Sequence, residues 1–457
     1  MINKFLQFSF CKPERSRRLI CKWMSYFDSA QYDTLCNNNF RKLLIIIIII
    51  FSFLSTLNSQ DHEKIIVKTG MDVLIETNFD SLAGKKIGLL TNFTGRTSKG
   101  TLSAEEFLKT KRCTLIKIFT PEHGFYTTVP AGEHVSDDNF DGIPVLSLYG
   151  SSRKPSREQL RQCDAIAVDL QDIGVRPYTY ISSVYNLMSA CSDEGIPVYI
   201  LDRPNPLGGL VVDGNVVEKD KESFIGIAPL PYVHGCTIGE LALMFNSEDW
   251  LPKDKNGNPK KCDLHIIKMQ NWKRWMWWDD TGLEWFPTSP HIPTVDAARG
   301  AAMLGAWGEL ALFSIGIGTT LPFQYVGSPN FNTDEILKKL NDSMPGVQLM
   351  PTKYNPTYGM YNGKNCNGFL LKFTPDSLFK PYTDGIRLVL AIRSLYPSLF
   401  NKKNFSSQAR AMFTKATGTD EIFDLLTEGK SDSEILNAAK KGLDDFIKIR
   451  AKYLLYK

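Results

Sequence analysis

The stretch TLIKIFTPEHG, residues 114–124, joins an apolar segment directly to a polar loop. Segment 114–120 is rich in β-branched and aromatic residues, and such a run is typical of a strand buried on both faces of a sheet. Pro121 ends the strand, and Glu122 and His123 follow. A carboxylate beside an imidazole suits acid–base chemistry, but one such pair in a loop is weak evidence. The other segments of the chain must show whether the pair belongs to a site.

Strand-like and helix-like segments alternate from residue 65 onward. Helical patterns follow the first, third and fourth of the predicted strands, and the last of them ends at Gly195, a typical helix stop. Short apolar strands that alternate with helices predict βαβ units and a parallel sheet covered on both faces. The predicted strands are KKIGLLTN (85–92), TLIKIFT (114–120), IPVLSLYG (143–150), AIAVDLQD (165–172) and IPVYILD (196–202).

Polar side chains follow four of these strands at the point where each strand ends. They are Asn92; Glu122 and His123; Asp169 and Asp172; and Asp202, Arg203 and Asn205. In open α/β sheets, ligands bind outside the carboxyl ends of the strands. Four strand ends with such groups therefore predict one site at this edge of the sheet.

A further helix is predicted over TIGELALMF, residues 237–245. Thr237 and Glu240 match the capping box S/T-x-x-E, so capping explains Glu240 at least as well as catalysis does. His234 precedes this helix and is better placed to face the site.

The sequence pattern changes from about residue 260. Residues 271–294 (NWKRWMWWDDTGLEWFPTSPHIPT) hold five tryptophans, and we expect three of them in the core and the others available to stack on a sugar ring. A glycine-rich loop (316–330) and short strands mixed with helices follow, which predicts a smaller α+β domain. We expect a leader over residues 1–59, a first domain over 60–255 and a second domain over 256–457.

The leader has the pattern of a secretory signal peptide. Arg41 and Lys42 precede the apolar run 43–54, and polar and small residues come next. Twelve apolar residues are short for a membrane span, which needs about 20, so we expect export and no stable membrane association after cleavage. An uncleaved anchor is the alternative.

Composition and missing motifs exclude several classes of function. The leader holds eight basic and three acidic residues, so the rest of the chain holds 45 basic and 46 acidic residues and is nearly neutral. This balance does not indicate a basic surface for binding nucleic acid. The body contains no G-x-S-x-G, G-x-G-x-x-G or P-loop motif and no zinc-type cysteine spacing. We expect no cofactor and no metal. Glycoside hydrolysis needs two carboxyl groups, and Glu122, Asp169 and Asp172 are candidates.

Ten motifs along the body are similar, in order, to those of the exo-β-N-acetylmuramidase (NamZ-like) family. They include TNFTG, TPEHGF, AGEHV, IPVLSLYG, DLQDIGVRPYTYIS, LDRPNPLGG, PTSPHIPT and GTTLPFQYVG. The resemblance implies a bacterial glycosidase, periplasmic or secreted, that releases N-acetylmuramic acid from the non-reducing ends of peptidoglycan fragments. It also implies a Rossmann-like first domain, a smaller α+β second domain and an active-site cleft between them.

The family motifs assign roles to residues of this chain. We expect Glu122 to be the main catalytic carboxyl group and the general acid, with His123, Asp169 and Asp172 in the catalytic set; the second participant stays open among these aspartates, a histidine and the substrate's acetamido group. The residues expected to bind muramyl saccharides are Asn92, Arg176, Tyr178, Tyr180, Arg203, Asn205, His234 and Thr320.

The chain departs from the family at two motifs. Many relatives have SEGRGTT where this chain has SIGIGTT, so Ile315 and Ile317 replace charged residues, and His291 replaces Asn in SPNMPT. An arginine is the natural partner of the lactyl carboxylate of muramic acid. We therefore expect Arg176 or Arg203 to bind that group. A non-catalytic cell-wall sugar-binding protein, or a glycosidase of different sugar specificity, is the alternative.

Overall fold

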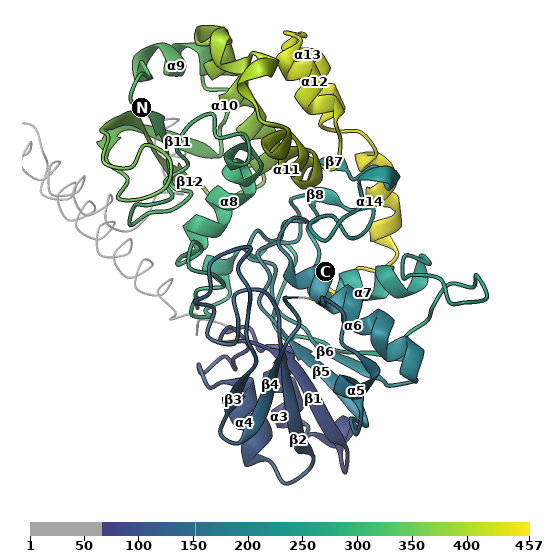
Figure 1. Cartoon of the computed structure of the whole chain (residues 1–457). Coiled ribbons are helices and arrows are strands. Elements are labelled where there is room, and N and C mark those ends of the chain that lie inside the picture. Colours follow the sequence, from purple (N-terminus) through teal and green to yellow (C-terminus); the bar gives the residue numbers. More distant parts are fainter. Residues whose placement is uncertain (1–65, 151) are drawn as a thin grey trace, which may run out of the picture. The chain divides into compact units, whose positions relative to one another are not determined.

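The computed structural model describes residues 66–150 and 152–457, and the predicted leader lies outside them (Figure 1). Within the described residues, no helix combines the length and the apolar character needed to cross a membrane.

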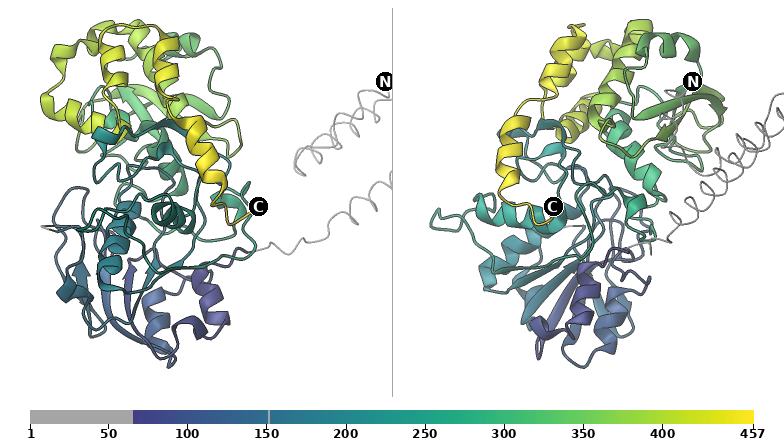
Figure 2. Two further views of the ribbon diagram at one scale, coloured as in Figure 1. Left: turned by 90° about the vertical axis from the view of Figure 1, so that its right-hand side faces the viewer. Right: turned by 180° about the vertical axis from the view of Figure 1, so that it is seen from behind.

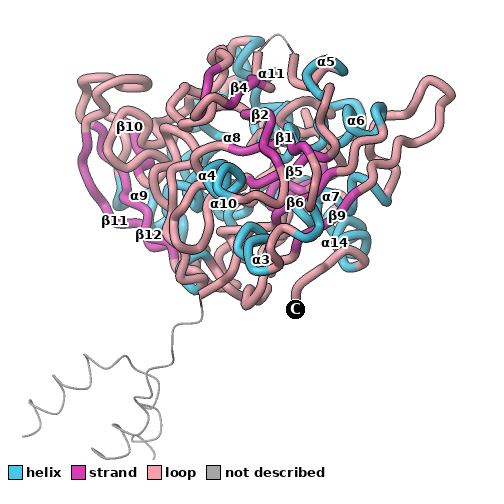
Figure 3. The backbone as a smooth tube through the Cα atoms, turned by 90° about the horizontal axis from the view of Figure 1, so that it is seen from below, coloured by secondary structure: helices cyan, strands magenta, loops and turns pink. Residues whose placement is uncertain are grey.

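A seven-stranded sheet forms the centre of the first domain, in the order β3-β4-β2-β1-β5-β6-β9 (Figure 3). All neighbouring strands are parallel except β3, which runs antiparallel to β4 at one edge. The strands are β1 (Lys86–Thr91), β2 (Thr114–Thr120), β3 (Asp138–Phe140), β4 (Ile143–Ser147), β5 (Ala165–Asp169), β6 (Val198–Leu201) and β9 (Leu264–Ile267). The predicted α/β class and parallel sheet are confirmed.

Helices cover both faces of this sheet because its central strands are apolar on both sides. In β1, Leu89 packs with α3 (Gly70–Glu76) and α4 (Ser103–Lys109). Its neighbour Leu90 points to the opposite face, as successive strand residues do. There it packs in the cluster that α5 (Arg157–Leu160), α6 (Tyr180–Glu194) and α7 (Ile238–Ser247) share.

Local sequence signals set the ends of these helices. Gly195 ends α6 in the left-handed conformation, with φ 66°. Thr237 caps α7 through the hydroxyl, which accepts from the Glu240 backbone N–H, and the Glu240 carboxylate accepts from the Thr237 backbone N–H. The predicted capping box is therefore confirmed, and Glu240 is fully buried.

The sheet continues past residue 255, the boundary that the sequence predicts between the domains. Its last strand, β9, pairs with β6 from Val198↔Leu264 to Leu201↔Ile267. The sequence gives little sign of this strand because, at the sheet edge, three of its four residues are only partly buried and His265 is exposed. The region around residue 260 therefore belongs to the sheet of the first domain.

The second domain places helices against a three-stranded antiparallel sheet of order β10-β12-β11. Its strands are β10 (Tyr325–Ser328), β11 (Val347–Tyr354) and β12 (Cys366–Phe373). Its helices are α8 (Val295–Gly308), α9 (Thr333–Leu340), α10 (Pro381–Leu395), α11 (Ser407–Thr417), α12 (Glu421–Thr427), α13 (Asp432–Ala438) and α14 (Leu443–Ala451). Short 3₁₀ helices lie at Asp80–Leu82, Lys219–Lys221, Trp278–Asp280, Pro397–Phe400 and Lys402–Asn404.

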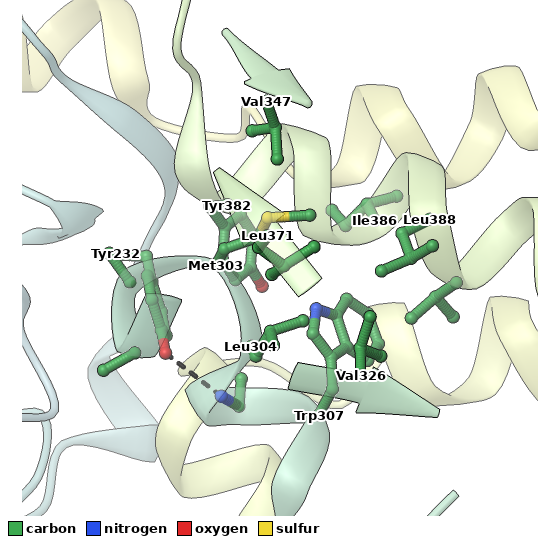
Figure 4. Packing of buried hydrophobic residues seen from close by; sticks show 14 of the residues in the cluster. Tyr232, Met303, Leu304, Trp307, Val326, Val347, Leu371, Tyr382, Ile386 and Leu388 are labelled. Atoms are coloured by element: carbon green, nitrogen blue, oxygen red, sulfur yellow. Dashed lines mark hydrogen bonds between the residues drawn. The ribbon is translucent and has the colours of Figure 1, made fainter. Parts of the chain in front are cut away.

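The core of this domain forms where α8 and α10 meet the sheet (Figure 4). Trp307 of α8 is fully buried among residues of both sheet and helices. Gly385 of α10 permits the close approach of the two helices, because a Cβ there would lie 2.2 Å from the Met303 carbonyl oxygen. The hydroxyl oxygen of Tyr232, from the first domain, accepts a hydrogen bond from the Ala306 N–H of α8 at 3.1 Å.

A two-stranded ribbon, β7 (Asp213–Val216) and β8 (Pro231–Val233), joins the domains. Asp213 accepts hydrogen bonds from the backbone N–H and the hydroxyl of Thr383, at the start of α10. The chain segments on both sides of the ribbon are therefore fixed by buried polar contacts as well as by apolar packing.

The end of the chain returns from α14 to the first domain (Figure 2). The Tyr456 hydroxyl donates to Asp202 at 2.6 Å, and the Lys457 carbonyl accepts from the Arg274 N–H at 3.1 Å. Burial raises the pKa of Asp202 to about 6, and its bonds from Tyr456, Gly239 and Thr237 oppose that shift. The C-terminal segment therefore stabilises the buried carboxylate at the end of β6.

We predict that Tyr456→Phe lowers the free energy of unfolding by about 1–3 kcal/mol, because it removes a donor from a buried carboxylate. Urea unfolding of the wild type and the variant measures the difference. Tyr126→Phe is the control, since Tyr126 is 48% exposed and its hydroxyl makes no hydrogen bond within the described residues. Equal stability of all three proteins would show that the C-terminal contact contributes nothing.

Candidate active site

Two residues of the loop after β2 have an uncommon backbone conformation, which sets the direction of their side chains. His123 and Gly124 both have left-handed φ angles, 73° and 75°. This conformation is unfavourable for a residue with a Cβ and persists where contacts hold it. Val129 supplies two of them: its carbonyl accepts from His123 Nδ1 at 2.8 Å, and its N–H donates to the His123 carbonyl at 3.2 Å.

The Glu122 carboxylate is fixed through both of its oxygens. Oε1 accepts from the Gly132 N–H at 2.9 Å, and Oε2 accepts from the Thr179 hydroxyl at 2.6 Å. The side chain is only 6% exposed. These bonds join the loop after β2 to the start of α6 and preorganise the carboxyl group.

The phenol of Tyr149 lies beside Glu122. Burial, then the charge of Glu122 and a hydrogen bond to it, raises the pKa of Tyr149 to about 12, although Arg153 opposes the shift. At neutral pH the phenol is therefore protonated and serves as a hydrogen-bond donor. Tyr149 and Thr179 were not among the predicted site residues.

The hydrogen bond of His123 defines its tautomer. A carbonyl oxygen only accepts, so Nδ1 carries the proton that bonds to Val129, and Nε2 of the neutral ring has a free lone pair. Burial lowers the pKa of His123, against the opposing effects of Val129 and Glu122. The ring is therefore neutral at pH 7 and can accept a proton through Nε2.

A second carboxyl group, Asp172, pairs with His234. The Cys236 N–H donates to Nδ1 of His234 at 3.2 Å, so Nε2 carries the proton of the neutral ring and lies 3.6 Å from Asp172 Oδ2. Asp172 Oδ2 also accepts from the Gly174 N–H at 2.7 Å. Its other oxygen, Oδ1, is buried and has no partner in the described residues. Asp172 thus keeps one buried acceptor without a protein partner among the described residues.

Asp169 has a different environment from Asp172. It is fully buried, forms an ion pair with Arg203 Nη1 at 3.0 Å and accepts from the Ser103 hydroxyl. Arg203 also donates to the Arg96 carbonyl and to Gln171. Asp169 and Arg203 are therefore each occupied by the other, which favours a structural role over the predicted catalytic role of Asp169 and the predicted substrate role of Arg203. We assign this pair to the scaffold.

Arg176 also belongs to the scaffold. Its guanidinium is completely buried and donates to the carbonyls of Asn215, Leu230 and Ala416, at 2.7–3.0 Å. These bonds join the loop after β5 to the β7–β8 ribbon and to α11. Every acceptor is a protein carbonyl, so the expected role of Arg176 in substrate binding is replaced by a structural one.

Two asparagines that were predicted to bind substrate form hydrogen bonds within the protein through their side-chain amides. Asn92 donates to the Tyr180 hydroxyl at 2.7 Å and accepts from Thr94, and Asn205 donates to the Cys236 carbonyl at 3.0 Å. The Tyr180 hydroxyl in turn donates to the Thr288 carbonyl at 2.5 Å. Asn92, Tyr180 and Asn205 thus fix the loops that carry the site. They do not present free groups to a substrate.

Aromatic side chains surround His123. The half-buried ring of Tyr178 stacks on it with centroids 6.3 Å apart, and Tyr180 lies edge-on to Tyr178 at 4.7 Å. Burial, and then the charge of the nearby His123, lowers the pKa of His291. His291 Nε2 lies 3.3 Å from the hydroxyl of Tyr358, a residue of the second domain.

Thr320 lies in the glycine-rich loop of the second domain. Its side chain is exposed and has no hydrogen bond within the described residues. The loop contacts the Tyr358 segment, because the Thr357 N–H and hydroxyl both donate to the Gly318 carbonyl. No contact joins Thr320 to Glu122, so its predicted role is a proposal only.

The tryptophan-rich segment is mostly core. Trp272, Trp277 and Trp278 are buried, which confirms the expected three of five, and Trp275 is 55% exposed. Among the described residues, no group of three or more His, Cys, Asp and Glu side chains is arranged to hold a metal ion.

A preorganised carboxyl group, a second carboxyl group and aromatic rings at the carboxyl edge of a parallel sheet define the site of a glycoside hydrolase. Comparison with known proteins agrees. Family models of exo-β-N-acetylmuramidase NamZ match this chain over residues 87–296 for the N-terminal domain and 302–456 for the C-terminal domain. The chain belongs to the NamZ family and is a glycoside hydrolase.

Individual relatives support the same assignment. The chain is 36% identical over 401 residues to the peptidoglycan β-N-acetylmuramidase NamZ of Bacillus subtilis (strain 168), covering 87% of this chain and 93% of the relative. Two solved DUF1343 family proteins from Bacteroides fragilis NCTC 9343 are 34% and 30% identical, with TM-scores of 0.79 and 0.67. Each match covers 86% of this chain, and 100% and 99% of the solved chains.

We predict that two aspartate-to-asparagine changes affect different properties, one mainly the stability and the other mainly the kcat. Asp169→Asn should lower the free energy of unfolding by about 3–5 kcal/mol, because it leaves the buried Arg203 charge unpaired. Asp172→Asn should change stability by less than about 1 kcal/mol and lower kcat, since Asp172 Oδ1 is free for the substrate. Urea unfolding and muramide hydrolysis measure the two effects. A stable Asp169→Asn protein that loses activity would reverse the assignment.

Proposed function

We propose that this chain is an exported exo-β-N-acetylmuramidase that removes N-acetylmuramic acid from the non-reducing ends of peptidoglycan fragments in cell-wall turnover. The proposal rests on membership of the NamZ family and on the B. subtilis relative named as a peptidoglycan β-N-acetylmuramidase. Export rests on the signal-like residues 41–60 of the leader and carries a periplasmic or secreted location with it.

The observation that carries the proposal is the position of Glu122. Its carboxyl group lies at the end of β2, held by Gly132 and Thr179, with Tyr149 and His123 next to it. Thr179 and Tyr149 are hydroxyl groups that adjust to either protonation state of the carboxyl. Glu122 is therefore suited to give a proton to the glycosidic oxygen as the sugar leaves.

Asp172 is the second carboxyl group that we propose for the reaction. Its buried Oδ1 has no partner in the described residues, and its proposed partner is the acetamido group of the substrate or the attacking water. His123 Nε2 is a further acceptor, because the ring is neutral and its other nitrogen is engaged with Val129. Asp169 has no free oxygen of this kind and is not part of this proposal.

The alternative of a non-catalytic binding protein was based on Ile315 and Ile317. Ile315 packs against the core of the second domain, and its side chain lies where a Cβ on Gly308 would meet it, at 2.6 Å. Packing explains this isoleucine without loss of a catalytic group. The catalytic proposal is therefore the stronger one.

We predict that Glu122→Gln lowers kcat by roughly 10²–10⁴-fold, because the amide keeps the shape and cannot give the proton. The assay uses a chromogenic β-N-acetylmuramide, and Glu133→Gln, in the same loop but exposed, is the matched control. A Glu122→Gln enzyme that turns over at the wild-type rate would rule out the assignment. Failure of the wild type to cleave the muramide would refute the proposed function itself.

A further inference from the structure

The proposed substrate carries a charge that needs a partner. N-acetylmuramic acid differs from N-acetylglucosamine by a lactyl ether on C3, and its carboxylate is ionised at neutral pH. A guanidinium group can bind such a carboxylate through two parallel hydrogen bonds. Selectivity for the muramyl sugar is therefore best explained by an arginine close to Glu122. This inference rests on the proposed function.

The two arginines expected from the sequence are occupied. Arg176 is fully buried against three carbonyls, and Arg203 is paired with Asp169. Arg96 lies near Arg203, but its guanidinium is enclosed between the rings of Phe93 and Phe286 and donates to two backbone carbonyls.

Other arginines of this part of the chain are held by carboxylates. Arg274 pairs with the buried Glu240, and Arg299 pairs with Asp279 and Asp296. None of these guanidinium groups is free to take a carboxylate from a ligand without breaking a protein ion pair.

Arg153 differs from all of these arginines. It lies in the loop after β4, its side chain is exposed, and it forms no ion pair within the described residues. Its guanidinium carbon lies 4.1 Å from the centroid of the Phe224 ring and 5.0 Å from that of Tyr149. The flat faces of these rings support the guanidinium, and its five N–H donors exceed what one bond to Tyr149 uses, so donors remain for a planar acceptor.

Tyr149 connects this arginine to the catalytic carboxyl group. The Arg153 guanidinium lies over the Tyr149 ring, and both Glu122 and Arg153 influence the pKa of this phenol by charge and by a hydrogen bond. Glu122 and Arg153 thus both lie next to the Tyr149 side chain.

We propose that Arg153 binds the lactyl carboxylate of the muramyl unit and gives the enzyme its preference for this sugar. Phe224 and Tyr149 hold the guanidinium in place, and the Tyr149 hydroxyl lies between the recognition group and the proton donor. The neighbouring cation, Lys154, is unsuited to this role because it is already bonded to Asp193 and Ser189. The position of Arg153 also explains how the chain can lack a charge at Ile317.

The test compares a chromogenic β-N-acetylmuramide with the same compound whose lactyl carboxylate is converted to a neutral amide. Arg153→Gln should raise KM for the acid about 10- to 100-fold, which corresponds to loss of charge-assisted hydrogen bonds, and should leave KM for the amide nearly unchanged. Arg153→Lys should keep part of the preference, since the charge remains. Arg157→Gln is the matched control, because Arg157 is four residues away and its side chain is 87% exposed.

Equilibrium binding separates this inference from the proposed function. Calorimetry with free N-acetylmuramic acid and with its lactyl amide needs no turnover, so it tests Arg153 even if the wild type cleaves neither substrate. Weaker binding of the acid alone to Arg153→Gln supports the inference. Equal losses for acid and amide, or no loss for either, overturn it, as does a wild type that does not prefer the acid. The melting temperature of each variant identifies losses caused by unfolding.

Discussion

The buried ion pair between Asp169 and Arg203 holds together the edge of the sheet where the site forms. Asp169 ends β5 and Arg203 follows β6, so the pair joins two adjacent parallel strands at their carboxyl ends. Ser103, at the start of α4, and the Arg96 carbonyl, in the loop after β1, bond to the same pair. Charges in such an environment persist only when they are fully paired, and this requirement fixes three loops at once.

The groups available to a substrate lie around this fixed centre. Glu122 comes from the loop after β2, and Asp172 lies three residues beyond Asp169. The two histidines have opposite tautomers, because His123 gives its Nδ1 proton to a carbonyl and His234 accepts at Nδ1 from an N–H. One ring thus offers a lone pair at Nε2, and the other directs a proton at Asp172. Backbone bonds set both states before a substrate arrives.

The sequence predicts the sheet and its functional edge well, because apolar runs and the polar residues that follow them are local signals. Glu122, Asp172 and His234 are predicted in this way. The roles of Asn92, Arg176 and Arg203 were not predictable. A strand-end position shows which edge a residue occupies, and tertiary contacts decide whether its side chain is buried against carbonyls or open to a ligand. Arg176, for example, bonds to Ala416, 240 residues away.

The residues that sequence analysis missed have the same physical cause. Tyr149 and Thr179 lie in motifs that were recognised, but the hydroxyl contacts with Glu122 depend on how three separate loops meet. Strand β9 was missed because, at the sheet edge, its three partly buried residues and the exposed His265 form no continuous apolar run.

A crystal structure of the Glu122→Gln protein with the disaccharide N-acetylmuramyl-β-1,4-N-acetylglucosamine tests the central claim most directly. The account predicts that the glycosidic oxygen lies within about 2.6–3.2 Å of the residue 122 side chain, with the muramyl ring over the edge formed by β2, β1 and β5. A disaccharide bound with its glycosidic oxygen against another carboxyl group, and residue 122 still bonded only to Gly132 and Thr179, would contradict it.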